Sequence, residues 1–383
     1  MSTLLYDYDP KRTKRWKRRL CKGIALTALS ISTYFLFYVS FVLFTKDLNE
    51  ETILCAFLLM TIALTNVLGG IFLISWQQGG GVRDFLTELQ AANGGRGVSA
   101  NLPRMHCLNR RFSKLTLTVC LYCTVFFVWL ATGHRPSGIQ FDEITSLFYY
   151  PQLRVLNFLS FNYLFIGWAI QLHIYSFCIA TATYEMKQFN REIENVASSD
   201  DACMLEYFSN AIDRYSKLSN AIRTLDEVLK RYAFTNIAML IPTSLFSLFS
   251  VIAHILSHAP NHEVLIVSPS ILFTSYAFLC LTVFPARLYD QINKSRSIFS
   301  AHIQQLLPYN RAVYTAALAF SAHLDQSDLG VTVWGFAVLS RRLILTVLTV
   351  MITCLSMLLQ FSDCSKERDH AAELLRNQSM NIE

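Results

Sequence analysis

Charged residues are scarce in this chain. Only 16% of its 383 residues are Asp, Glu, Lys or Arg, whereas 53% are hydrophobic, and an ordinary soluble domain carries roughly 25% charged residues. The apolar residues come in long blocks, and a hydrocarbon core about 30 Å thick needs a helix of about 20 such residues. The shortage of charge therefore argues against a soluble multi-domain protein and predicts an all-α, polytopic membrane protein.

The sequence also lacks the clusters of reactive side chains that enzymes and metal proteins need. Cys120 and Cys123 form a C-x-x-C pair inside an apolar block, without the two further ligands of a structural zinc site. His258 and His262 have helical spacing but lie in a short loop, which favours an ordinary polar loop. We therefore expect no enzyme, no cofactor and no metal, and the net charge of +6 requires no nucleic acid as a partner.

Seven blocks are long and apolar enough to cross a membrane. The first, residues 24–44, is 21 residues without a charge, too long for a signal-peptide core, so it is predicted to be a retained span. The fourth contains polar residues, which in hydrocarbon normally face other helices or a cavity; they include Asn157, Asn162, Gln171 and His173. The predicted spans are 24–44, 52–76, 115–132, 156–182, 233–256, 264–286 and 343–361.

Basic residues are distributed unevenly between the two sides of these spans. Of the 33 Lys and Arg residues, 27 fall on the N-terminal segment and the connections on its side, and 6 on the opposite side. Positive residues favour the cytoplasm. The distribution predicts an N-terminus inside the cell, a C-terminus outside, and a multi-pass protein of the plasma membrane in contact with membrane lipid.

Two cytoplasmic connections are long and have the pattern of helices. In the run that begins at Met204, apolar residues recur at spacings of three and four, as at Ile222, Leu225 and Leu229. Such a stripe is typical of an amphipathic helix that packs against another helix. Helices four to seven are therefore expected to extend into a cytoplasmic anchor.

The expected organisation has five parts. They are a basic cytoplasmic N-terminus (1–23), six spans with their helical extensions (24–286), the anchor with the first part of helix seven (287–342), the last span (343–361) and an extracellular tail (362–383). Two glycine-containing stretches, 79–81 and 91–100, are expected to be linkers.

The last span carries a polar stripe. Five polar residues recur at spacings of 3, 4, 3 and 4 and fall within an arc of about 80°; they are Thr346, Thr349, Thr353, Ser356 and Gln360. Two interpretations are open: the helix lines a pore in an assembly of several copies, or its hydroxyls bond to their own backbone and let helices approach closely. The amide of Gln360 is costly in hydrocarbon without partners or water, which favours the pore.

The end of this span resembles a family signature. Residues 353–361 read T-C-L-S-M-L-L-Q-F, similar to the pattern T-Y-h-h-h-h-h-Q-F (h, hydrophobic) of the insect gustatory receptor family, which has nematode relatives. Thr353, Gln360 and Phe361 match the pattern, whereas Cys354 stands where the family usually has Tyr. Seven spans, the N-terminus inside and the long cytoplasmic extensions agree with the same family.

The resemblance implies a chemosensory, ligand-gated, non-selective cation channel. In that family, a homotetramer or a tetramer of related subunits surrounds one pore made by four copies of the last helix, and the cytoplasmic extensions hold the subunits together. The Gln and Phe of the motif, here Gln360 and Phe361, form the outer gate. Sugars, bitter compounds, carbon dioxide, light and peroxide are all represented among the stimuli of similar proteins.

The resemblance also implies a pocket for a small-molecule ligand in the outer half of each subunit. Aromatic walls with a few polar groups suit a small organic molecule, and the same residues also suit helix packing. The candidates are Asn157, Phe161 and Trp168 in the fourth span, Thr243 and His254 in the fifth, and Thr274 and Tyr276 in the sixth.

A G-protein-coupled receptor is the alternative with seven spans. It requires an outside N-terminus, against the charge distribution, and the chain has no Asp-Arg-Tyr at the end of the third span and no Asn-Pro-x-x-Tyr in the seventh. A secondary transporter is disfavoured because the sequence has no internal repeat and no pair of Gly/Pro-broken helices. An outside C-terminus predicts glycosylation at the sequon that begins with Asn377.

Overall fold

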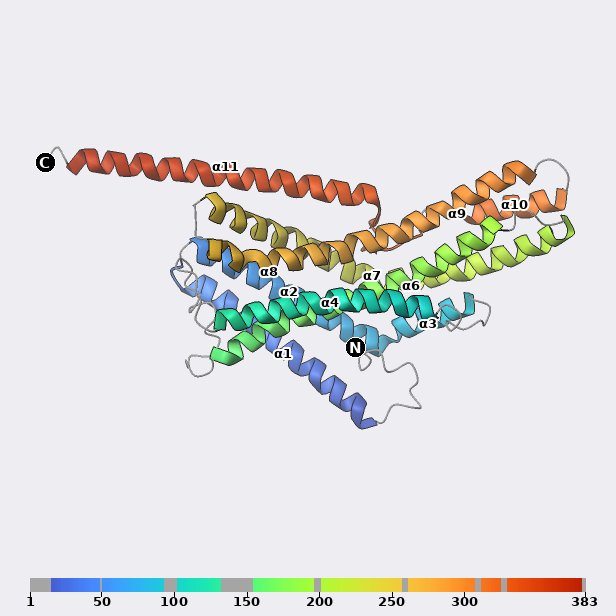
Figure 1. Cartoon of the computed structure of the whole chain (residues 1–383), viewed down its shortest axis with the longest axis horizontal. Coiled ribbons are helices and arrows are strands. Elements are labelled where there is room, and N and C mark those ends of the chain that lie inside the picture. The colour runs from blue at the N-terminus through green and yellow to red at the C-terminus, as the bar shows by residue number, and fades with distance from the viewer. Residues whose placement is uncertain are drawn as a thin grey trace.

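The computed structural model describes residues 15–48, 50–92, 102–131, 154–195, 201–256, 261–306, 311–324 and 329–380. Nearly all of them are helical, apart from a small antiparallel hairpin of β1 (Thr332–Val333) and β2 (Ala337–Val338). The helices, shown in Figure 1, are α1 (Arg15–Thr45), α2 (Glu50–Gly79), α3 (Gly81–Ala92), α4 (Leu102–Ala131), α6 (Arg154–Asn195), α7 (Asp201–Leu256), α8 (Asn261–Phe278), the π-helix η4 (Leu279–Val283), α9 (Phe284–Leu306), α10 (Arg311–Leu324) and α11 (Arg341–Met380).

The predicted spans all fall on helices. Only Thr132, the last residue of the third span, lies outside the described residues. Within the described part of the chain, five helical segments are long and apolar enough to cross a membrane, in α2, α6, α7, the α8–η4–α9 helix and α11, and the apolar stretch Leu29–Thr45 of α1 is shorter. The prediction of an all-α membrane protein is thus confirmed.

Two helices are much longer than a membrane is thick. α6 has 42 residues and α7 has 56, which correspond to about 63 and 84 Å at 1.5 Å per residue. Figure 1 shows both continuing with α9 beyond the other helices towards α10. The amphipathic stripe predicted on α7 is buried there, with Ile222, Leu225 and Leu229 each at most 1% exposed. The predicted helical extensions are therefore confirmed.

An aromatic cluster holds the far end of these extensions together. Phe320 of α10 is fully buried, and its ring centroid lies 4.4 Å from that of Phe299 on α9 and 5.8 Å from that of Tyr215 on α7. Phe189 of α6 completes the cluster at 6.5 Å. Four helices from three separate parts of the sequence thus share one apolar contact.

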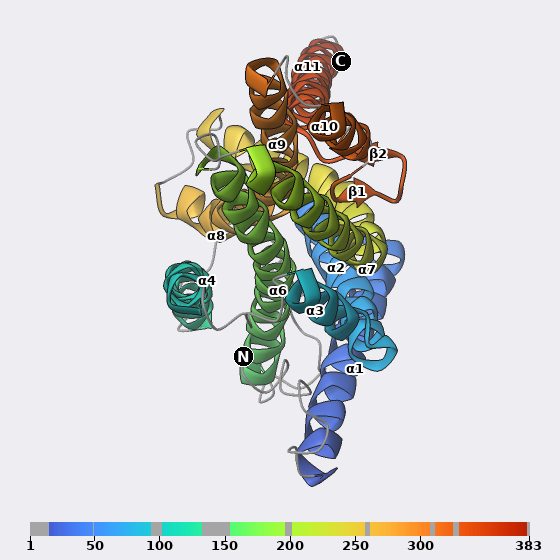
Figure 2. The same cartoon turned by 90° about the vertical axis from the view of Figure 1, so that its right-hand side faces the viewer.

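The glycine stretch 79–81 is a tight turn rather than a linker. α2 continues to Gly79 and α3 begins at Gly81, so only Gly80, with a φ of 71°, lies between the two helices. A positive φ is available to glycine without a steric penalty. The turn lets α3 bury Phe85 and Leu89, and α3 packs against α7; Figure 2 shows α3 and the hairpin close to α7.

The seventh helix differs from the prediction at both ends. Its expected first part is a separate helix, α10, which the hairpin divides from α11. At the other end, α11 continues beyond Phe361 to Met380, because residues such as Glu367, Ala371 and Leu374 are good helix formers. The charged residues mark the end of the apolar block, not the end of the helix.

The polar residues of the fourth span whose side chains are described, Asn162, Gln171 and His173, face other helices, as predicted. The amide oxygen of Asn162 accepts a hydrogen bond from Thr124 of α4 at 3.1 Å, and Gln171 is buried against α2. A Cβ atom on Gly69 would lie 1.9 Å from Oε1 of Gln171. Glycine at position 69 therefore lets the amide enter the contact between α2 and α6.

We predict that Phe320→Ala destabilises the extension by about 3–5 kcal/mol, because it leaves a cavity inside the aromatic cluster. Phe320→Leu, which keeps most of the volume, is expected to cost clearly less. The measurement is the thermal midpoint of the detergent-purified protein. Equal midpoints for the two variants and the wild type would contradict the importance of the cluster.

Candidate functional site

The last helix, α11, contacts its own subunit along one face. Figure 1 shows it running beside the bundle. Between Arg341 and Gln360, Met351 is the only buried residue. The contact with α7 and the η4 region surrounds a shallow apolar groove, lined by Ile237, Leu240, Ile241, Phe278, Thr282, Leu339, Leu343, Ile344, Val347 and Met351. The remaining faces of α11 in this segment are open to lipid or to another chain.

The predicted polar stripe lies on the open side of α11. At 100° per residue, Met351 lies about 180° from the centre of the stripe, and Met351 lines the groove shared with α7. All five stripe residues are exposed: Thr346, Thr349, Thr353, Ser356 and Gln360. Packing within the subunit therefore does not explain the stripe. The side chain of Phe361, the second predicted gate residue, lies outside the described residues.

The hydroxyl groups of the stripe are bonded to their own helix. Each donates to the carbonyl four residues earlier at 2.9–3.1 Å, from Thr346, Thr349, Thr353 and Ser356. Because each hydroxyl has a single proton, the oxygen then offers only lone pairs to its surroundings. The stripe therefore presents a row of hydrogen-bond acceptors on the open face of α11. Such a row suits water and cations.

Four of the ligand-pocket candidates have described side chains, and all four are buried. The Thr243 hydroxyl lies 3.1 Å from that of Thr61 on α2, and the Thr274 hydroxyl donates to the carbonyl of Ile271 at 3.1 Å. The side chains of the other three candidates, Asn157, Phe161 and His254, lie outside the described residues.

Trp168 and Tyr276 both pack against one aromatic ring, that of Phe273. The centroid of Phe273 is 4.8 Å from that of Trp168 and 6.2 Å from that of Tyr276. The indole nitrogen of Trp168 donates to Oδ1 of Asn236 on α7 at 3.0 Å. The structure thus brings two candidates from α6 and α8 together, and it leaves Thr243 with α2. Their assignment to a ligand pocket stays a prediction.

A buried histidine network joins α4, α6 and α8. Nδ1 of His173 lies 3.0 Å from the hydroxyl of Thr116, which lies 2.9 Å from the hydroxyl of Tyr276. Nε2 of His173 lies 3.3 Å from Oδ1 of Asn109, and the ring of Phe112 stacks on the imidazole at 4.9 Å. The sequence signalled this network only through a histidine inside an apolar span, because its partners come from distant segments.

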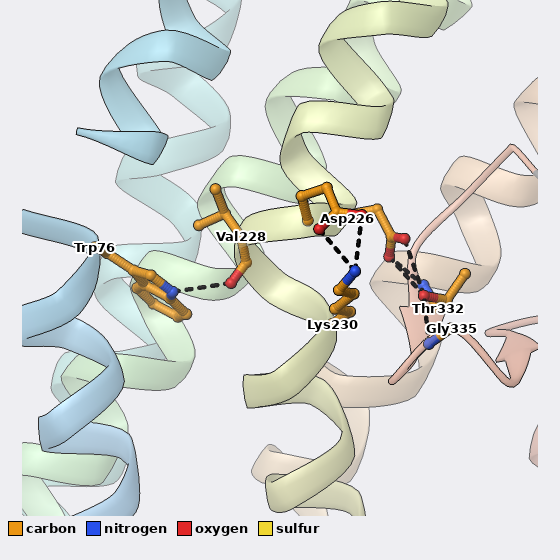
Figure 3. Close-up of polar contacts among 7 residues, drawn as sticks. Trp76, Asp226, Val228, Lys230, Thr332 and Gly335 are labelled. Atoms are coloured by element: carbon orange, nitrogen blue, oxygen red, sulfur yellow. Dashed lines mark hydrogen bonds and ion pairs between the residues drawn. The ribbon is translucent and has the colours of Figure 1, made fainter. Parts of the chain in front are cut away.

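A hub on α7, at residues 224–232, is the second site that sequence analysis missed. Figure 3 shows it from the side, with Trp76 and Thr332 on opposite flanks of α7. The indole nitrogen of Trp76 donates to the carbonyl of Val228 at 2.9 Å. On the other flank, the carboxylate of Asp226 accepts hydrogen bonds from the backbone N–H and the hydroxyl of Thr332, at 2.6 and 2.9 Å. The hub therefore joins α2 to the hairpin that leads into α11.

The first turn of α11 is held by two polar contacts. Ser340 caps the helix, because its hydroxyl oxygen accepts from the N–H of Leu343 at 3.4 Å. Arg341 forms an ion pair with Asp290 of α9 at 2.7 Å. The cap defines where α11 begins, and the ion pair links its first turn to α9.

Side chains that could bind a metal ion do not cluster in the part of the chain that the structure describes. No three His, Cys, Asp or Glu side chains in that part come close enough to hold a metal ion. The cysteines at 120 and 123 are free thiols, partly and fully buried.

Comparisons with known proteins point to one family. The sequence model of a family described as 7tm chemosensory receptor matches residues 5–363. The fold is similar to that of the insect olfactory receptor OR5 from Machilis hrabei, with a TM-score of 0.68, 13% identity and 92% of each chain covered. The structure of that receptor in complex with eugenol is similar to the same degree, with a TM-score of 0.68, 11% identity and 92% of each chain covered. No curated protein matches at a significant level.

We predict that Trp168→Phe lowers stability by about 1–3 kcal/mol, because it leaves the buried Asn236 oxygen without its donor. The double variant with Asn236→Leu removes that oxygen and is expected to recover part of the loss. Thermal midpoints of the purified proteins provide the comparison. Additive losses in the double variant would show that the hydrogen bond is not the cause.

Proposed function

Because this chain belongs to the 7tm chemosensory receptor family, whose sequence model matches residues 5–363, we propose that it is a ligand-gated, non-selective cation channel whose pore is lined by α11. The observation that carries the proposal is the polar stripe on α11, exposed on the side opposite its contact with α7. A row of polar side chains that contacts no other helix of its own subunit is expected to face water or another chain.

The chemistry of the stripe supports cation passage. Each of the four hydroxyl groups uses its one proton in a hydrogen bond to a backbone carbonyl. The hydroxyl oxygens therefore offer only acceptor lone pairs to the surroundings. Acceptor oxygens replace part of the hydration shell of a cation, whereas anions require donors. Gln360 stands at the end of the row, where the family resemblance assigns the outer gate together with Phe361.

The geometry of one subunit supports an assembly of several copies. A single α11 cannot enclose a pore, and its open faces carry exposed apolar side chains beside the stripe, such as Leu345 and Ile352, each 64% exposed. Several copies around an axis place the stripe inward and these residues against neighbours or lipid. We propose a homotetramer, or a tetramer with related subunits, held together by the extensions of α6, α7, α9 and α10.

The ligand is proposed to be a small organic molecule. The structure of the Machilis hrabei receptor in complex with eugenol is an example of such a ligand in a protein of similar fold. The side-chain candidates for this chain remain those of the fourth to sixth spans. A G-protein-coupled receptor is not favoured, because the family match covers nearly the whole chain.

We predict that Gln360→Ala changes single-channel conductance, cation selectivity or basal opening, because it removes the amide at the end of the stripe. Ligand sensitivity is expected to change by less than about twofold, since Gln360 lies far along the helix from the bundle contacts. The matched control is Leu355→Ala, which lies off the stripe on the same helix. Currents of Gln360→Ala that equal those of the wild type would remove Gln360 from the gate.

A second prediction concerns orientation. An N-terminal epitope tag is expected to bind antibody only after cells are permeabilised, and a C-terminal tag on intact cells, because most basic residues lie on the N-terminal side. Asn377→Gln is expected to abolish any glycan that a glycosidase removes. The chain has a second sequon at residues 293–295, on the side that the basic residues assign to the cytoplasm, so Asn293→Gln is expected to leave the glycan unchanged. An N-terminal tag reached on intact cells would reverse the topology and disprove the channel proposal.

A further inference from the structure

The hairpin between α10 and α11 is built as a rigid element. Residues Thr332 and Val333 pair with Val338 and Ala337, and the N–H of Leu339 donates to the carbonyl of Val331 at 2.9 Å. The N–H of Phe336 closes the turn on the carbonyl of Val333 at 3.0 Å. These hydrogen bonds tie the two short strands to each other across the turn. Any displacement of its base therefore displaces the start of α11, which follows it directly.

The turn of the hairpin contains a strained residue. Trp334 has a φ of 54°, in the left-handed region that residues other than glycine adopt only at a cost. Two contacts with α7 hold it there: its N–H donates to the carbonyl of Lys230 at 3.3 Å, and its ring packs edge-on against Phe234 with centroids 5.0 Å apart. The conformation of the turn thus depends on its contact with α7.

Asp226 makes the strongest link between the hairpin and α7. One carboxylate oxygen accepts from the N–H of Thr332 at 2.6 Å, and both oxygens lie 2.9 Å from its hydroxyl. The Thr332 hydroxyl oxygen in turn accepts from the N–H of Gly335 at 3.1 Å. Hydrogen bonds to a charged acceptor are about twice as strong as neutral ones. Figure 3 shows the carboxylate and the threonine facing each other.

The same two turns of α7 are attached to the transmembrane bundle on their other flank. Trp76 of α2 donates to the carbonyl of Val228, and the Thr224 hydroxyl donates to Glu88 of α3 at 2.6 Å. Gly81 lies so close to Val228 that a Cβ atom would come within 2.6 Å of its Cγ2. α2 and α3 therefore both contact α7 at the level of Asp226.

We propose that Asp226 is a positioning residue for gating: its hydrogen bonds to Thr332 latch the hairpin to α7 and so transmit movement of α2 and α7 to the pore helix. The inference rests on the proposed channel function. It assigns to Asp226 no contact with the ligand or with permeating ions. Weakening the latch changes how often the pore opens and leaves the open pore itself unchanged.

The test compares two substitutions of the same residue. Thr332→Val keeps the shape and the backbone N–H but removes the hydroxyl, whereas Thr332→Ser keeps both donors. The measurement is single-channel recording in planar bilayers without added ligand. The open probability of Thr332→Val is expected to differ about tenfold from that of the wild type, while its conductance equals that of the wild type. The open probability and the conductance of Thr332→Ser are both expected to equal those of the wild type. An altered conductance, or an open probability equal to that of the wild type, would overturn the proposal.

A second measurement needs no current. Hydrogen exchange of the purified full-length protein is expected to be at least fivefold faster in Thr332→Val at residues 331–339, and unchanged in α3 and in the aromatic cluster around Phe320. Protection equal to that of the wild type would refute the latch even if the protein conducts. Absence of current in the wild type together with faster exchange in the variant would instead reject the channel proposal and retain the attachment of the hairpin.

Discussion

Polar side chains buried between helices organise this protein, because each one must find a partner where water is absent. The bonds Trp168–Asn236, Thr243–Thr61 and Thr116–His173 each join helices that are distant in the sequence. An apolar contact between helices tolerates rotation or sliding, since lipid is as apolar as the helix surface. A buried polar pair does not, because displacement leaves a donor or acceptor unsatisfied. The relative positions of α2, α4, α6 and α7 depend on these pairs.

α7 is the element on which the other contacts converge. It packs against α2, α3, α8, α10 and α11 and against the hairpin, and its 56 residues reach from the outer spans to the aromatic cluster of the extension. Its hub at residues 224–232 contacts α2 and α3 on one flank and the hairpin on the other. α7 therefore links the proposed ligand pocket in the fourth to sixth spans to the start of α11, which contacts α7 near its middle.

The last helix, α11, which we propose lines the pore, has the opposite character. Its first turn is fixed by a cap and an ion pair, and the following segment offers one apolar face to α7 and a row of acceptor oxygens to the outside. A helix that is firmly held at one end and loosely packed beyond it can tilt without disrupting the subunit. The arrangement within one chain thus suits a gate, and the enclosed pore requires the neighbouring copies.

The sequence alone determined the spans, the long extensions and the polar stripe, since these depend on local periodicity and on charge: the apolar blocks, the spacings of Ile222, Leu225 and Leu229, and the hydroxyls from Thr346 to Ser356. It did not reveal α3 as a packed helix, the continuation of α11 to Met380, the His173 network or the latch between Asp226 and Thr332. The His173 network and the latch join residues that are distant in the sequence, 160 positions apart for Thr116 and Tyr276 and 106 for Asp226 and Thr332. Tertiary structure alone decided which side of α11 faces α7. The periodicity of one helix identifies its polar stripe, but it does not identify the helix that packs against the opposite side.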